Sequence, residues 1–103
     1  MASFDDGMLH IDFEQRLVIV DGRPVDLAPA VYKVLTRLVL RPGDSVSGEE
    51  LAGLTGVSPQ RIRSVIARLR LKLGSDHPWV NDGSPIEEVP GPGYRWRSEV
   101  NQD

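Results

Sequence analysis

The chain has 103 residues, of which 40% are hydrophobic, and this is enough for one modest core but not for two. It has no cysteine, only two histidines and a formal net charge of −3, which excludes disulfide-stapled folds and zinc fingers of recognisable spacing. No stretch approaches a transmembrane span, and Asp5 and Asp6 stand where a secretory signal would need positive charge, so we expect a cytoplasmic protein with no membrane partner.

The N-terminal part predicts a small antiparallel sheet. Residues 9–13 alternate apolar and polar side chains, and residues 16–20 form a continuous run rich in β-branched side chains. Asp21-Gly22 then signals a hairpin, whose return strand is residues 24–27. We expect residues 1–7 to be a flexible N-terminus.

Two helices are predicted next. The first opens at Ala28-Pro29 and stops before Pro42. Ser47 caps the second, over residues 49–55, and Glu50 at the third helical position completes a capping box with it. The apolar positions of the first helix repeat at helical spacing and are Val31, Val34, Leu35, Leu38 and Val39.

A tight turn joins the second predicted helix to a third over residues 59–73. Gly56 can supply the left-handed backbone that ends the second helix, and Val57 can fill the corner. Ser58 is then a good N-cap and Pro59 a good first helical residue. This spacing is that of a helix-turn-helix.

The third helix has two chemically different faces and concentrates positive charge. One face is an apolar stripe of Ile62, Ile66, Leu69 and Leu73, with Val65 at its edge. The opposite face presents Gln60, Arg63, Ser64, Ala67 and Arg68. The helix holds five of the 12 basic residues and none of the 15 acidic ones, which indicates a single face for phosphates and bases. Its basic residues are Arg61, Arg63, Arg68, Arg70 and Lys72.

The C-terminal part predicts one more hairpin. Gly74 is a candidate C-cap, and the segment after it is polar and rich in turn residues. Residues 86–89 and 94–97 are the expected strands, with residues 90–93 as the turn. We therefore expect an α+β fold, a winged helix-turn-helix with N-terminal antiparallel strands, three helices and a C-terminal β-hairpin wing. The expected domain is residues 8–97, followed by a flexible tail over residues 98–103.

Several motifs in order carry a family resemblance. The chain resembles the effector domain of the OmpR/PhoB class of bacterial response regulators, and the motifs that carry the likeness are residues 23–29, 41–47, 68–74 and 90–95. The resemblance implies that Arg68 contacts a base or groove, that Arg70 contacts a phosphate and that Tyr94 is a wing residue beside the DNA backbone. It also implies two copies on repeated half-sites.

The chain departs from that family at the residues that would set its DNA contacts. Arg63 and Val65 stand where the family usually has Asp and His, so its base preference does not transfer. Pro90 and Glu87 stand where the family's wing usually carries arginines, and a negative wing is repelled by phosphate. The link between the second and third helices is also shorter than the family's loop, which in many members touches RNA polymerase.

The sequence therefore predicts a sequence-specific transcription regulator that binds double-stranded DNA as a homodimer on repeated half-sites and contacts RNA polymerase. The main alternative is a protein-interaction module of the same fold, which contacts RNA polymerase or another regulator through its acidic surfaces. We expect no enzyme activity, small-molecule substrate, cofactor or metal. The residues predicted to contact bases are Gln60, Arg63, Ser64 and Arg68, and those predicted to contact the DNA backbone are Arg61, Arg70, Lys72, Tyr94 and Arg95.

Overall fold

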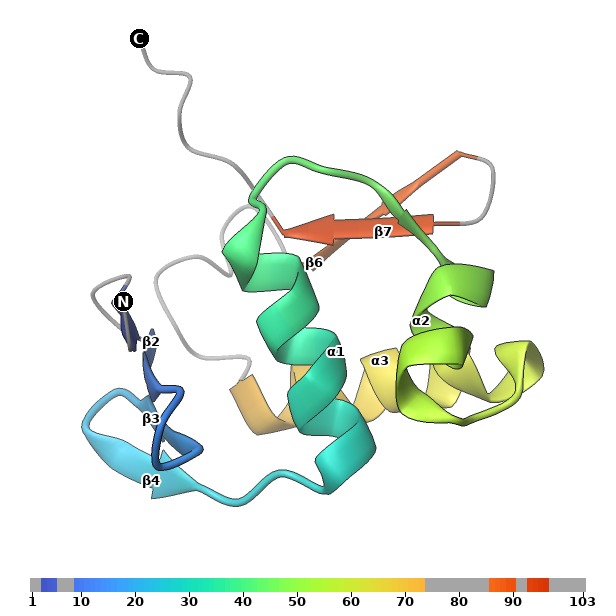
Figure 1. The fold of residues 1–103 in the computed structure, drawn as a ribbon. Coiled ribbons are helices and arrows are strands. Elements are labelled where there is room, and N and C mark those ends of the chain that lie inside the picture. The colour runs from blue at the N-terminus through green and yellow to red at the C-terminus, as the bar shows by residue number, and fades with distance from the viewer. Residues whose placement is uncertain (1–2, 6–8, 74–85, 91–92, 97–103) are drawn as a thin grey trace, which may run out of the picture.

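The computed structural model describes residues 3–5, 9–73, 86–90 and 93–96 (Figure 1). The described residues form three helices, α1 (Pro29–Leu40), α2 (Gly48–Thr55) and α3 (Pro59–Leu73). Strands β1 (Ser3–Asp5), β2 (Leu9–Asp12), β3 (Leu17–Val20) and β4 (Arg23–Val25) precede them, β5 (Val46–Ser47) leads into α2, and β6 (Ile86–Val89) and β7 (Gly93–Trp96) follow. This order confirms the predicted winged helix-turn-helix.

The N-terminal strands form an antiparallel sheet in the order β1-β2-β3-β4. Asp21 and Gly22 join β3 to β4 with φ angles of 55° and 78°, the left-handed values that a two-residue hairpin turn requires. The predicted hairpin is therefore confirmed. The sheet contributes the buried side chains Leu9, Ile11, Val18 and Val20 to the core.

Strand β1 was not predicted, because residues 1–7 were expected to be flexible. Phe4 instead pairs with Ile11 of β2, and its ring meets the Trp96 ring edge-on, with centroids 6.3 Å apart. Residues 3–5 are therefore part of the N-terminal sheet. The ring contact also joins the N-terminal sheet to β7 at the other end of the chain.

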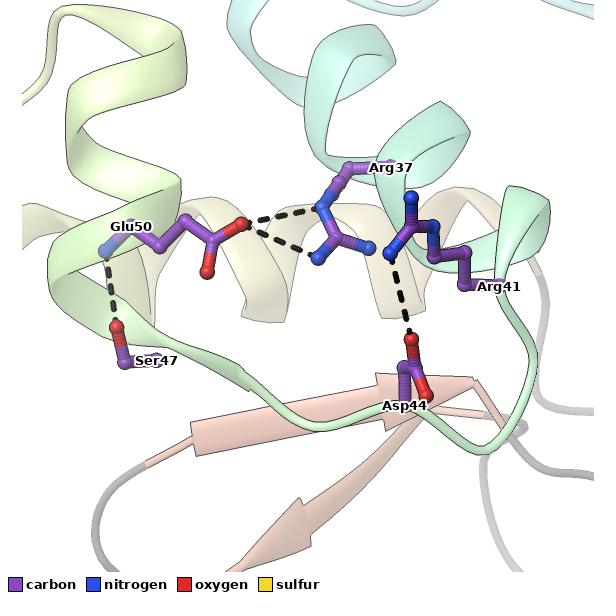
Figure 2. Close-up of polar contacts among 5 residues, drawn as sticks. All are labelled: Arg37, Arg41, Asp44, Ser47 and Glu50. Carbon is purple, nitrogen blue, oxygen red and sulfur yellow. Dashed lines mark hydrogen bonds and ion pairs between the residues drawn. The ribbon is translucent and has the colours of Figure 1, made fainter.

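Helix α1 crosses α3 and packs against α2, α3 and β7 (Figure 1). Its five predicted apolar positions are all buried. The helix ends at Leu40, and Gly43 in the following link donates its N–H to the Trp96 carbonyl at 2.9 Å. Arg41 and Asp44 form an ion pair of 3.8 Å across the same link (Figure 2).

Helix α2 has half of its predicted capping box. The Ser47 hydroxyl accepts a hydrogen bond from the Glu50 N–H at 3.0 Å, as expected. The Glu50 carboxylate does not complete the box, because it accepts from Arg37 of α1 at 3.1 and 3.3 Å (Figure 2). A charge-assisted pair between two helices has replaced the second, neutral-donor bond of the box.

Strands β5, β7 and β6 form a second sheet in that order. A Cβ added to Gly93 would lie 3.0 Å from the Val46 carbonyl oxygen, so a glycine lets β5 and β7 approach closely. None of the described helices is both long and apolar enough to cross a membrane. The expectations for Gly74, the segment 75–85, turn residues 91–92 and the tail 98–103 lie outside the described residues.

Candidate nucleic-acid interface

The turn between α2 and α3 has the predicted tight geometry. Gly56 ends α2 with a φ of 77° and donates its N–H to the Ala52 carbonyl. The Thr55 hydroxyl donates to the Leu51 carbonyl at 2.9 Å and accepts from the Val57 N–H at 3.3 Å. These bonds fix the direction in which the chain enters α3.

Helix α3 has the two predicted faces. The four residues of its apolar stripe are each no more than 1% exposed. All five residues of the opposite face are exposed, namely Gln60, Arg63, Ser64, Ala67 and Arg68. The buried stripe therefore holds a polar, basic surface toward solvent.

One edge of this surface, which we call the open flank, carries Arg61, Arg68 and Lys72. These residues are spaced i, i+7 and i+11, so they lie along one side of the helix. None of the three makes an ion pair or a side-chain hydrogen bond with any other residue that the structure describes. The open flank thus offers three cations without such a partner in the described part of the chain.

An open hollow of about 530 Å³ lies beside the open flank. Arg61, Ser64 and Arg68 line it from α3, and Ala30 and Val31 line it from the first turn of α1. That first turn contains no acidic residue, and a helix N-terminus carries a partial positive charge. The hollow is open to solvent and borders both arginines.

The other edge, which we call the wing flank, carries Arg63 and Arg70. Arg63 Nη1 lies 3.3 Å from Glu88 Oε2 of β6. Arg70 Nη2 donates to the Ile86 carbonyl of the same strand at 2.8 Å. Both arginines of this flank are therefore occupied by the β6–β7 hairpin, the wing.

Three residues predicted to contact the DNA backbone are engaged within the protein. Arg70 is half-buried, and its Nε is buried without a hydrogen-bond partner among the described residues. Tyr94 is only 6% exposed and belongs to the core. Arg95 donates from Nε to Glu87 Oε1 at 2.7 Å. Each of these groups would have to give up a protein contact or leave the core before it could reach a phosphate.

The sequence contained signals for two of these placements. Tyr94 and Trp96 are two residues apart on one strand, so they point to the same face, and both are buried. Glu87 and Arg95 are directly cross-strand partners, which favours an ion pair between them. Sequence reasoning also missed Glu88 as the partner of Arg63, for which strand pairing gives no signal.

The structure thus sorts the predicted contacts into two groups. Gln60, Arg61, Ser64, Arg68 and Lys72 are exposed and make no ion pair or side-chain hydrogen bond with another described residue, whereas Arg63, Arg70, Tyr94 and Arg95 are paired, bonded or buried within the protein. Within the part of the chain that the structure describes, no three His, Asp or Glu side chains are grouped so as to hold a metal ion.

A family model described as "Transcriptional regulatory protein, C terminal" matches residues 22–96. No curated protein sequence matches the chain significantly. The match spans the first helix through the wing, and so includes both flanks of α3. It confirms the resemblance that the ordered motifs indicated.

Solved structures give the same picture of the fold. Response regulator DrrB of Thermotoga maritima, an OmpR/PhoB homologue, superimposes with a TM-score of 0.82 at 27% identity, over 94% of this chain and 45% of that one. The RstA DNA-binding domain of Klebsiella pneumoniae, solved in complex with the RstA box, has a TM-score of 0.73 at 27% identity, over 94% and 98% of the two chains. The CpxR DNA-binding domain of E. coli has a TM-score of 0.75 at 24% identity, over 95% and 98%. The chain therefore spans less than half of DrrB.

Proposed function

The chain belongs to the family of transcriptional regulatory protein C-terminal domains, and from that premise we propose that it regulates transcription by binding double-stranded DNA sequence-specifically through α3. The observation that carries the proposal is the charge of α3, which has five basic residues, four of them exposed, and no acidic one in a protein of net charge −3. Such a surface attracts phosphate locally while the rest of the molecule does not. The structure of the similar RstA DNA-binding domain in complex with the RstA box supports DNA as the partner.

The outward face of α3 has the chemistry for reading bases in a major groove. Ser64 and Ala67 are small and exposed, so the helix backbone can come close to the base edges. Gln60 can pair with adenine, and Arg68 can donate two hydrogen bonds to O6 and N7 of guanine. We assign base contacts to these residues, and to Arg63 once it has left Glu88.

Phosphate contacts belong to the open flank in this proposal. A helix in the major groove has a DNA backbone on either side of it, and the side next to α1 faces Arg61 and Lys72. Neither side chain has an ion pair or a side-chain hydrogen bond with another described residue to break before it binds phosphate. On the wing flank, the side next to the other DNA backbone carries the Glu88 carboxylate, which repels phosphate.

A single domain of this size makes few contacts, so we propose that two copies bind repeated half-sites as a homodimer. Contact with RNA polymerase is a further proposal, for which the acidic surface outside α3 is the available region. The proposed role is binding and not catalysis, in keeping with a family of regulators.

Selection of binders from a random duplex library at near-physiological salt tests the proposal without knowledge of the operator. We expect a short repeated motif to be enriched, with an affinity that falls steeply as salt rises. The matched control is the triple variant Arg61→Ala, Arg68→Ala, Lys72→Ala, which keeps the buried stripe and should enrich nothing. A wild-type library left unenriched, with binding that is flat against salt, would reject DNA reading and favour the protein-interaction module.

A further inference from the structure

The wing is fastened to the recognition helix by two contacts from one short strand. Arg70 donates to the Ile86 carbonyl at 2.8 Å, and Arg63 lies 3.3 Å from the Glu88 carboxylate. Arg63 and Arg70 are seven residues apart, so both lie on the same side of α3. Strand β6 therefore runs along the wing flank and meets it at both of its arginines.

The two contacts differ in burial and therefore in how readily they break. The Arg70 bond is half-buried, whereas the side chains of Arg63 and Glu88 are 75% and 49% exposed. An exposed ion pair is weak and exchanges readily with water and salt. The Arg63 contact can therefore open while the Arg70 contact keeps the wing in place.

Glu88 is the acidic side chain of the wing that acts on α3. Its neighbour Glu87 is paired with Arg95 across the hairpin at 2.7 Å, so its charge is already balanced within the wing. Glu88 has no such partner within the wing among the described residues, and its carboxylate reaches the helix. A carboxylate in this position offers Arg63 the same kind of anionic oxygen that a phosphate would offer.

We propose that Glu88 is an internal competitor of DNA for Arg63, so that the wing withholds one arginine of α3 from any duplex that cannot displace it. This inference rests on the proposed function. When DNA enters, Arg63 exchanges the Glu88 carboxylate for a phosphate or for guanine O6 and N7, and Glu88 is left facing the duplex. Binding therefore has to overcome the lost pair and the repulsion between Glu88 and phosphate.

The competition has a thermodynamic signature. Replacement of Glu88 by glutamine should tighten duplex binding about three- to fivefold, the range of a partly exposed ion pair. It should also make the slope of log affinity against log salt steeper by about the share of one phosphate contact. The reason is that Arg63 then neutralises a phosphate without first losing a carboxylate.

The test compares Glu88→Gln with Glu14→Gln on duplexes selected with the wild-type protein and on random duplexes. Glu14→Gln removes the same charge from an exposed turn of the N-terminal sheet and should change affinity less than twofold. A double-mutant cycle with Arg63→Ala should show coupling. Glu88→Gln should increase DNA affinity much less in the Arg63→Ala background than in the wild type. Glu88→Asp keeps the charge, but its shorter side chain pairs less well with Arg63. It should therefore show part of the increase in duplex affinity that is expected for Glu88→Gln.

Each outcome is decisive. Equal affinities of Glu88→Gln and Glu14→Gln, or an undiminished gain in the Arg63→Ala background, would overturn the competition while leaving DNA reading intact. A wild-type protein that binds no duplex would overturn the proposed function, and the competition with it. Thermal unfolding of all variants confirms that the folded domains are being compared.

Discussion

The two flanks of α3 carry similar cations, but the protein treats them differently. On the open flank, Arg61, Arg68 and Lys72 have no partner among the described residues. On the wing flank, Arg63 is paired with Glu88, and Arg70 is bonded to the backbone of β6. A count of basic residues on a helix therefore overstates the charge that is available to a ligand, because tertiary neighbours decide which cations remain free.

The difference follows from the cost of exchanging partners. An exposed cation without a protein partner gives up only water and counterions when it meets phosphate, and counterion release favours binding. A cation that already has a partner must lose that contact first. We therefore expect DNA affinity to be carried by the open flank and wing attachment by the wing flank.

The largest expected effect comes from a substitution in the buried stripe of α3, which holds both flanks in place. Leu69 of the buried stripe is 0% exposed, and Leu69→Ala should lower the free energy of unfolding by about 2–5 kcal/mol, measured by urea denaturation. Leu71→Ala on the same helix is the matched control, because Leu71 is 80% exposed and should change stability by less than about 0.5 kcal/mol. Equal losses would show that α3 is not held by its stripe.

The next effect separates the flanks by DNA affinity. Arg68→Ala should weaken binding to a selected site by about 1–3 kcal/mol and relax preference at one base pair, because a bidentate contact to guanine is lost. Arg63→Ala should cost less, since Arg63 gives up Glu88 before it reaches DNA. Fluorescence anisotropy on the selected duplex measures both variants. A larger loss for Arg63→Ala would reverse the roles of the flanks.

The third effect separates them by stability. Arg70→Ala should lower the free energy of unfolding by about 1–2 kcal/mol, because a charge-assisted hydrogen bond to the wing is lost and part of a buried side chain with it. Arg61→Ala, on the open flank, should leave stability within about 0.5 kcal/mol of wild type. Urea denaturation of the pair distinguishes them. If Arg70→Ala leaves stability unchanged and weakens DNA binding instead, the original assignment of Arg70 to a phosphate stands.

Local signals were enough to predict the helices and turns. The five apolar positions of α1 and the four of α3 are buried because helical periodicity alone decides which residues share a face. The hairpin at Asp21-Gly22 and the turn at Gly56 followed from residues that tolerate left-handed backbone. Each of these features depends on neighbours in sequence.

The missed features depend on residues far apart in the chain. Strand β1 is held by pairing with β2 and by the contact of Phe4 with Trp96, and three residues carry too little pattern to show this. The placement of the wing against α3 brings Glu88 to Arg63 and Ile86 to Arg70. Helical periodicity predicts that Arg63 and Arg70 lie on one side of α3. Only the position of the β6–β7 hairpin shows that both already contact the protein.

The smallest expected effect tests whether a cation of the open flank contacts phosphate directly. Lys72→Ala should weaken binding to all sequences evenly and reduce the slope of log affinity against log salt by about 0.9, the share of one phosphate. Lys33→Ala removes the same charge from the exposed side of α1 and should leave the slope unchanged, because a cation outside the interface releases no counterion on binding. A slope that falls equally in both variants would mean that affinity follows net charge. The open flank would then attract DNA through its charge alone and would make no specific phosphate contacts.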